Sequence, residues 1–277
     1  MIRECGVVDP SNDMWAKTGD DHGNRDDHAL WLSLHQHLLD SARIASVLWD
    51  SFWPDKTKLF IEDALGVSTA RKLYVFLAGI HDVGKCSPGF QNQIRYNYPE
   101  LVQHAEEAIH ERIPIDAKNH DCRHESTGYI AIDDWLKTNG VNRRVADSIA
   151  TIIGGHHGVY SSMTIASQNE IADELIDTPS LKAYGNDDSW NGARRAIIDS
   201  VFADSELTME EVRSLPILSL PMQTVLTGMV IIADWMASNQ DYLPLSENGS
   251  SKNEESKRIG NAWRSLNLTK PWNIKND

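Results

Sequence analysis

The stretch FLAGIHDVGKCSPGFQ, residues 76–91, decides the fold. It begins as an apolar helix, because three apolar residues recur at helical spacing: Leu73, Leu77 and Ile80. Gly84 is expected to close this helix in the left-handed conformation that often follows a helix end. Ser87-Pro88 then predicts a new helix, with the serine as N-cap and the proline at the first helical position.

The predicted helix end places His81 and Asp82 side by side. An aspartate can bridge two cations through its two oxygens, and a neutral histidine beside it can bind one of them. Lys85, just past the turn, could hold an anionic oxygen near the same point. These residues predict a metal-dependent hydrolase. The alternative is that the pair only complements a helix dipole and is solvated, so the rest of the sequence has to decide.

Composition limits the classes of protein that fit. The 277 residues, 41% of them hydrophobic, are enough for one sizeable core or two small ones. The N-terminus lacks the apolar run of a signal peptide, and the three cysteines have no CxxC spacing, so we expect reduced thiols and a cytoplasmic protein. A net charge of −14 argues against a broad nucleic-acid-binding face, although bound cations can supply positive charge locally.

Further histidines lie at the ends or on the faces of predicted helices. A helix from Asp27 to Phe52 places His37 beside its apolar stripe, and His124 opens a helix that ends near Thr138. A third helix ends in Gly-Gly-His156-His157-Gly, where the glycines allow the bend that adjacent imidazoles need to converge. Each histidine alone fits an ordinary structural or solvated role as well. Because no strand of convincing length appears, the sequence predicts an all-α fold.

A run without charged residues, 214–233, comes directly before Asp234. Its length would suit a membrane span, but its prolines and polar residues favour a buried central helix, so we expect no membrane association. A carboxylate on so apolar a helix is costly to bury unless a cation or strong donors compensate. Asp234 is therefore predicted to be a metal ligand facing Asp82, the alternative being a solvated helix end.

The composition places one domain over residues 1–243, and a polar linker with a docking segment over 244–277.

The candidate ligands are five imidazoles and two carboxylates: His37, His81, Asp82, His124, His156, His157 and Asp234. A mixed set of this kind suits Mn, Fe, Co or Ni, with Mg and Zn as further candidates, better than it suits Ca. Seven ligands exceed what one ordinary site uses, so two divalent cations bridged by Asp82 are expected. Paired cations about 3.5–4 Å apart are suited to in-line attack at phosphorus.

The order H…HD…H…HH…D resembles the HD-domain metal-dependent phosphohydrolase superfamily. In its details the sequence resembles one branch, the HD nuclease domain of the CRISPR-associated helicase-nuclease of type I systems, and within these subtype E. The stretches that carry the resemblance are WAKT (15–18), LHQHLLD (34–40), HDVGKCSPGFQ (81–91), RHE (123–125), GHHG (155–158) and ADWMAS (233–238).

The resemblance implies a compact helical domain and a role for each candidate residue. His37, His81, Asp82 and Asp234 would hold one metal, and Asp82, His124, His156 and His157 the second. Lys85 would contact the scissile phosphate or stabilise its developing charge. The substrate would be single-stranded DNA, fed by a helicase after a crRNA-guided surveillance complex opens the target. This sequence has no Walker A pattern, so the helicase is expected to be a domain that is absent here or a separate chain.

Two other functions stay open at this point. The first is an HD phosphohydrolase that acts on a nucleotide or cyclic dinucleotide; the negative charge favours a small substrate, but the sequence has no GYP motif and no triphosphate-binding cluster of basic residues. The second is a non-catalytic interaction module on a degenerate HD scaffold. The complete set of ligand types argues against that second function.

Overall fold

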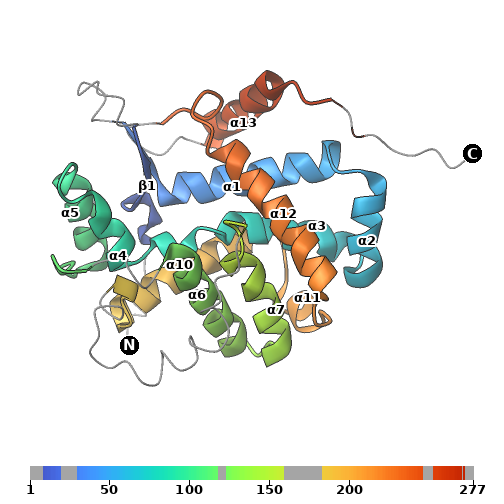
Figure 1. Ribbon diagram of the computed structural model, residues 1–277, viewed down its shortest axis with the longest axis horizontal. Coiled ribbons are helices and arrows are strands. Elements are labelled where there is room, and N and C mark those ends of the chain that lie inside the picture. The colour runs from blue at the N-terminus through green and yellow to red at the C-terminus, as the bar shows by residue number, and fades with distance from the viewer. Residues whose placement is uncertain are drawn as a thin grey trace, which may run out of the picture.

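The computed structural model describes residues 9–19, 30–117, 123–158, 183–245, 252–269 and 271. These residues are mostly helical, as predicted (Figure 1). The helices are α1 (Leu34–Ser51), α2 (Asp55–Leu65), α3 (Val67–Ile80), α4 (Pro88–Gln91), α5 (Pro99–Ile109), α6 (His124–Thr138), α7 (Arg143–Gly154), α10 (Asp188–Asp204), α11 (Met209–Arg213), α12 (Leu220–Ala237) and α13 (Lys252–Leu266). Short 3₁₀ turns lie at η1 (Pro10–Asn12), η3 (Val83–Lys85) and η4 (Asn92–Ile94).

Three helices, α1, α3 and α12, form the centre of the fold. Helix α1 packs against both of the others, α6 pairs with α7, and α7 also contacts α12 (Figure 1). Their apolar faces share one buried cluster, which includes Leu38 of α1, Leu77 of α3 and Val230 of α12. Burial of these faces is the main stabilising contribution to helices that would be marginal alone. The packing brings the helix positions that carry the candidate ligands to one place.

Two short strands were not predicted. β1 (Trp15–Thr18) and β2 (Trp31–Ser33) pair antiparallel, so the predicted helix start at Asp27 is wrong. Helix α1 begins at Leu34, where the Ser33 hydroxyl caps it by accepting from the backbone N–H of Gln36. The strands are too short to show the alternation by which strands are found in a sequence.

The expected left-handed conformation of Gly84 is wrong as well. Gly84 is not one of the described glycines that have a positive φ. At the end of α3, His81 keeps the right-handed helical conformation. Gly84 is required for another reason: a Cβ added there would lie 1.8 Å from the carbonyl oxygen of His124. The turn therefore packs its backbone directly against the start of α6. The predicted N-cap is present, since Ser87 accepts from the backbone N–H of Phe90 at the start of α4.

Helix α12 is long and apolar enough to cross a membrane by length and composition. It begins at Leu220, later than the uncharged run suggested, with Ser219 as its N-cap. It packs against α1, α3 and α7, and the Tyr74 hydroxyl of α3 donates to the Met229 carbonyl across the contact, at 3.0 Å. These contacts are those of the central helix that the sequence predicted.

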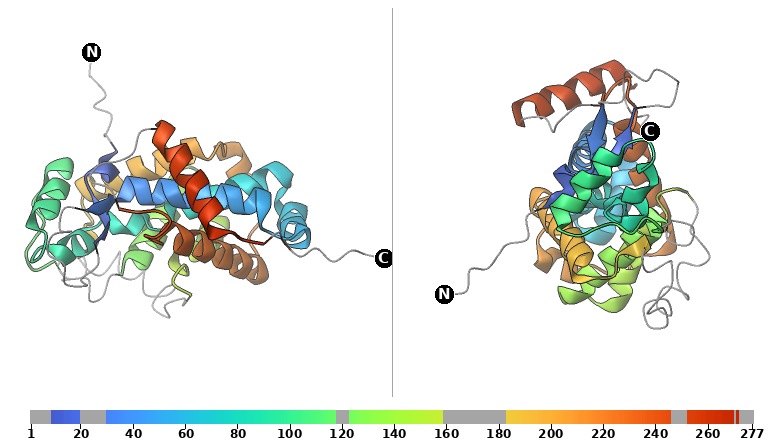
Figure 2. Two further views of the ribbon diagram at one scale, coloured as in Figure 1. Left: turned by 90° about the horizontal axis from the view of Figure 1, so that it is seen from above. Right: turned by 90° about the vertical axis from the view of Figure 1, so that its left-hand side faces the viewer.

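The last described helix, α13, lies on α1 at the outside of the helical body (Figure 2). The Arg258 guanidinium pairs with the buried Asp40 carboxylate of α1 at 3.1 Å. Ile259 and Ala262 are buried. The boundary between residues 243 and 244 stays a prediction, but the segment beyond it does contact α1.

Candidate metal centre

All seven predicted ligands lie together, most of them buried, and His157 is exposed. They come from α1 (His37), the end of α3 (His81 and Asp82), the start of α6 (His124), the turn after α7 (His156 and His157) and α12 (Asp234). They form two clusters, His37–His81–Asp82–Asp234 and His124–His156–His157, and within each cluster the potential ligand atoms lie within 4.8 Å of one another. The helix packing thus joins residues almost 200 positions apart in the sequence.

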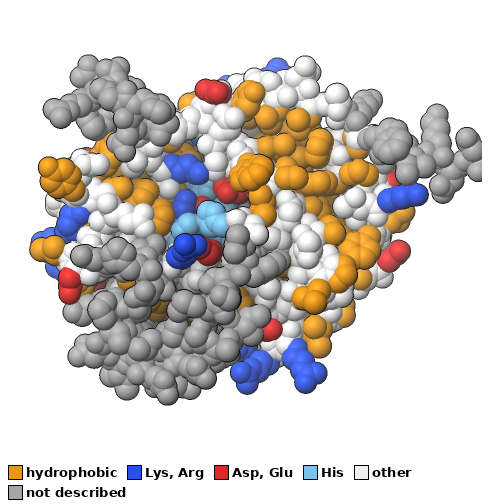
Figure 3. Space-filling model, in the orientation of Figure 1, with side chains coloured by type: hydrophobic (Ala, Val, Ile, Leu, Met, Phe, Trp, Pro, Cys, Tyr) orange, Lys and Arg blue, Asp and Glu red, His pale blue; other side chains and the backbone are white. Residues whose placement is uncertain are grey.

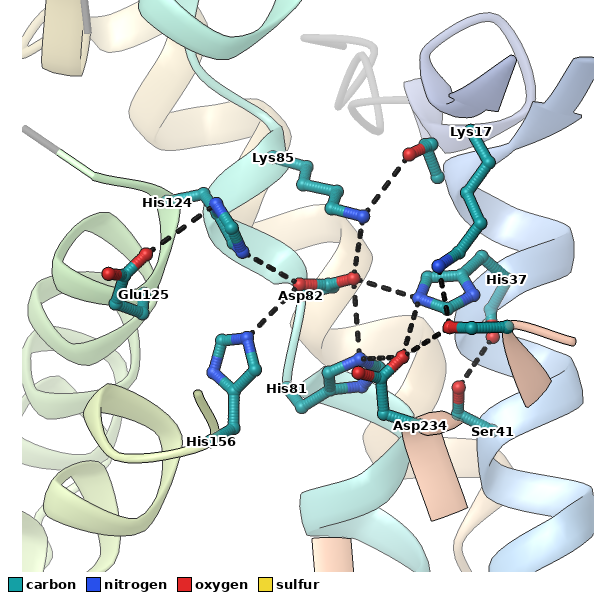
Figure 4. A network of polar contacts seen from close by, with 12 residues as sticks. Lys17, His37, Ser41, His81, Asp82, Lys85, His124, Glu125, His156 and Asp234 are labelled. Carbon is teal, nitrogen blue, oxygen red and sulfur yellow. Dashed lines mark hydrogen bonds and ion pairs between the residues drawn. The ribbon is translucent and has the colours of Figure 1, made fainter. Parts of the chain in front are cut away.

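The Asp82 carboxylate lies between the two clusters (Figure 4). Its Oδ2 is 2.8 Å from His37 Nε2 and 3.3 Å from His81 Nε2. Its Oδ1 is 3.3 Å from Nε2 of His124 and from Nε2 of His156. Each oxygen therefore faces a different cluster, which is the arrangement a bridging carboxylate needs.

Asp234 closes the first cluster from α12. Its Oδ1 lies 3.3 Å from His81 Nε2 and 3.5 Å from His37 Nε2. The Asp234 side chain is 15% exposed, so it is not the solvated helix-end carboxylate of the alternative interpretation. In the second cluster His157 Nε2 is 2.8 Å from His124 Nε2, and the chain bends at residues 155–158, as convergence of the adjacent histidines requires. Gly158 in this bend has a φ of 81°.

Two of the histidines are oriented by backbone carbonyls. His81 Nδ1 lies 2.8 Å from the Ala78 carbonyl, and His156 Nδ1 lies 2.6 Å from the Ile153 carbonyl. In the neutral imidazole that ligates a metal, Nδ1 would donate to this carbonyl, and Nε2, which points toward Asp82, would carry the lone pair. Within the described residues, the Nε2 atoms of both are buried and make no hydrogen bond. Metal-binding histidines are held in this way, with one ring nitrogen bonded and the other turned to the ion. The donor set therefore fits divalent cations.

Burial and charge shift the pKa values of these groups in different directions. Burial disfavours the imidazolium of His81, but the Asp82 and Asp234 carboxylates outweigh that effect and raise its pKa to about 10. For His37 burial dominates and lowers the pKa to about 3, although its hydrogen bond to Asp82 acts against the shift. Burial would raise the pKa of Asp82, yet Lys85 and His81 hold it well below its usual range. The site thus keeps its carboxylates charged.

Metal-free protein is expected to lose stability as the pH rises from about 6.5 to about 10. The folded pKa of His81 is raised above its ordinary value of 6.5 to about 10, so its stabilising effect is complete below the unfolded pKa and is lost as the pH passes the folded one. A ligating imidazole is neutral, so bound metal removes this dependence. Melting temperatures across this range, in chelator and in Mn²⁺, measure the effect, and His81→Gln isolates the contribution of His81. An equal alkaline slope in that variant would contradict the assignment.

Two lysines, Lys85 and Lys17, lie beside the Asp82 and Asp234 carboxylates. Lys85 is 7% exposed; its Nζ lies 2.8 Å from Asp82 Oδ2 and donates to the Ala16 carbonyl at 3.1 Å. Lys17 of β1 donates to the Ser238 hydroxyl at 2.5 Å, and Ser238 donates to Asp234 Oδ1 at 2.7 Å. Burial, with a smaller contribution from Lys85, lowers the pKa of Lys17.

Lys17 and Ser238 received no role from the sequence. Ser238 stands four residues after Asp234, the spacing at which side chains on one helix meet, and this was the available signal. Lys17 lies in the stretch WAKT that carries the resemblance, but no spacing linked it to the site, because Ser238 lies 221 residues away.

Part of the site reaches the surface. His157 is exposed and His124 is partly buried, and Figure 3 shows histidine side chains open to solvent beside basic and acidic side chains.

Comparisons with known proteins agree with this geometry. A family model described as the HD domain of Cas3 matches residues 15–243. The CRISPR-associated nuclease/helicase Cas3 of Streptococcus thermophilus is 30% identical over 279 residues, covering 93% of this chain and 28% of that protein.

Two solved structures share the fold. The Thermus thermophilus cas3 HD domain, crystallised in the presence of Ni²⁺, superposes with a TM-score of 0.61 at 21% identity, over 93% of this chain and 90% of that one. A chain of a CRISPR RNA-guided surveillance complex in a pre-nicking state gives a TM-score of 0.60 at 24% identity, over 92% of this chain and 28% of that one. The resemblance found in the sequence is confirmed, while subtype E stays a prediction. The chain belongs to the Cas3 HD domain family.

Proposed function

We propose that this chain is a cytoplasmic, metal-dependent nuclease that cuts phosphodiester bonds of single-stranded DNA during CRISPR interference. The observation that carries the proposal is the position of Asp82, whose two oxygens face two separate groups of imidazoles at 2.8–3.3 Å. Membership of the Cas3 HD domain family, with a nuclease/helicase as a relative, supports the same activity.

The residues of the site would divide the work as follows. His37, His81, Asp82 and Asp234 would hold one divalent cation, and Asp82, His124, His156 and His157 would hold the other. When bound, such a pair would supply an activated water and positive charge for the oxygens of a displacement at phosphorus. The Ala78 and Ile153 carbonyls keep His81 and His156 in the ligating orientation. Lys85 holds Asp82 in place and adds positive charge for an anionic oxygen.

The donor set favours a class of metal ion. Imidazole with carboxylate suits Mn²⁺, Fe²⁺, Co²⁺ or Ni²⁺, with Mg²⁺ and Zn²⁺ as weaker candidates. The crystallisation of a related HD domain with Ni²⁺ supports this class of ion.

The partners are proposed from the relatives. The chain spans roughly a quarter of the length of the curated nuclease/helicases it matches, so we infer a helicase motor in cis or in trans. The likeness to a chain of a surveillance complex supports delivery of the DNA by a crRNA-guided complex. Because the net charge is −14, the isolated chain should bind DNA weakly and depend on these partners for processive cutting.

Circular single-stranded DNA is the substrate that tests the proposal. Purified protein stripped with chelator is expected not to cut it, and added Mn²⁺, Co²⁺, Ni²⁺ or Fe²⁺ should restore cutting, which gel electrophoresis follows as loss of the circle. Cutting a circle requires an endonuclease, so the assay excludes end-dependent contaminants. Release of phosphate from nucleotides or cyclic dinucleotides without DNA cutting would assign the chain to the alternative, small-substrate class.

A further inference from the structure

We propose that Lys17 is a DNA phosphate contact at this metal centre, a role that the sequence gave only to Lys85. The inference rests on the proposed function, because it names the group that receives the nucleic-acid strand. It follows from a comparison of the surroundings of the two lysines that lie beside the site.

The donors of Lys85 are largely in use. An ammonium group has three N–H donors, and Lys85 directs one to Asp82 and one to the Ala16 carbonyl. Its side chain is 8% exposed, and its contact with Asp82 cannot be given up without leaving a buried carboxylate poorly compensated. Lys85 is therefore placed to hold Asp82 and strand β1 rather than to receive a mobile substrate.

The donors of Lys17 are mostly available. Within the described ranges its recorded hydrogen bond is the one to Ser238, which leaves two N–H groups for a ligand. Lys17 is partly buried rather than fully so, and its ammonium lies beside the cluster of His37 and Asp234, as Figure 4 shows. A lysine of this kind is a point charge suited to a single phosphate oxygen.

The strand that carries Lys17 is fixed in position. Lys85 donates to the Ala16 carbonyl. From the same segment, Gln91 Oε1 accepts from the Trp15 backbone N–H, and Gln91 Nε2 donates to the Trp15 carbonyl. The Trp15 ring also stacks on Phe90, with centroids 4.3 Å apart. Lys17 is thus presented by a rigid strand. In a chain of net charge −14, a cation so placed attracts a phosphate specifically to the centre.

A purely positioning role for Lys17, acting through Ser238 on Asp234, makes a different prediction. Its loss would then disturb the metal cluster and leave the electrostatic component of DNA binding unchanged. Ser238→Ala, which removes the link but keeps the ammonium, reproduces that case.

The test compares wild type with Lys17→Ala, Lys17→Arg and Ser238→Ala, and with Lys56→Ala, which removes an exposed lysine at the start of α2. Fluorescence anisotropy measures binding of a short single-stranded oligonucleotide in chelator across a salt series. We expect the slope of log K against log salt to fall by about 0.7 in Lys17→Ala alone. In the presence of Mn²⁺, kcat/KM for DNA cleavage by Lys17→Ala should fall roughly 10- to 100-fold, mainly through a higher KM. Lys17→Arg should retain much of the wild-type kcat/KM.

Metal content by mass spectrometry and melting temperature complete the test. Both should equal the wild-type values in Lys17→Ala. An unchanged salt slope, or a loss of metal shared with Ser238→Ala, would overturn the phosphate contact while leaving the nuclease proposal intact. Wild-type protein that neither binds nor cuts DNA would overturn both.

Discussion

Asp82→Ala is expected to abolish DNA cleavage, with a loss on the order of 10³-fold or more, because the proposed two-metal site depends on one carboxylate for both ions. The two oxygens of Asp82 face the two imidazole clusters, so no other described side chain can replace its bridging role. Removing it also leaves Lys85 buried without its carboxylate partner. Cleavage of circular single-stranded DNA and metal content per chain measure the two consequences.

Two further variants separate chemistry from folding. Asp82→Asn keeps the shape of the side chain but removes its charge, and it is expected to be folded and equally inactive. Asp241→Ala removes an exposed aspartate just after α12 and should retain full activity. Normal cutting by Asp82→Ala at normal metal content would end the two-metal interpretation.

Gly84→Ala is expected to destabilise the protein by about 3 kcal/mol or more, and with it to lower activity sharply. The added methyl group would lie 1.8 Å from the His124 carbonyl and 2.5 Å from the Gly128 backbone nitrogen. Both are backbone atoms of α6, so no side chain can rotate away and the helix itself must move. That movement displaces His124 from Asp82. Chemical denaturation and the DNA cleavage assay should therefore both show the change.

The matched control is Gly192→Ala in α10, where an added Cβ meets nothing within 4 Å. There alanine should stabilise the helix by up to about 1 kcal/mol, because it lowers the entropy of the unfolded chain and has the higher helix propensity. If both variants unfold at the wild-type denaturant concentration, the close approach of the turn and α6 is not a constraint on the sequence.

The residues that cluster at the candidate site were identifiable in the sequence. Metal-binding side chains at helix ends, such as His81-Asp82 and His156-His157, stand out against apolar helices, and a carboxylate after a long uncharged run is costly unless something compensates its charge. Helical periodicity likewise identified the central helices. These signals are local, and the structure brings the residues that carry them to one place.

What the sequence did not show depends on contacts between distant segments. Strand β1 forms because Trp31 and its neighbours pair with it. Neither strand is long enough to show the alternation of apolar and polar residues that predicts a strand. The reason for Gly84 is the backbone of α6, about forty residues away in the chain. Lys17 and Ser238 are 221 residues apart in the chain, so their contact could not be predicted from residue spacing.

The contact between Arg258 and Asp40 has a practical consequence for anyone who trims this protein. Asp40 is 1% exposed and stands one turn after His37 on α1. A chain cut at the compositional boundary near residue 243 would retain every candidate ligand, yet it would lose the guanidinium that neutralises this carboxylate. The smallest fragment worth expressing therefore extends through Leu266, even though Asp234 is the last of the seven candidate ligands.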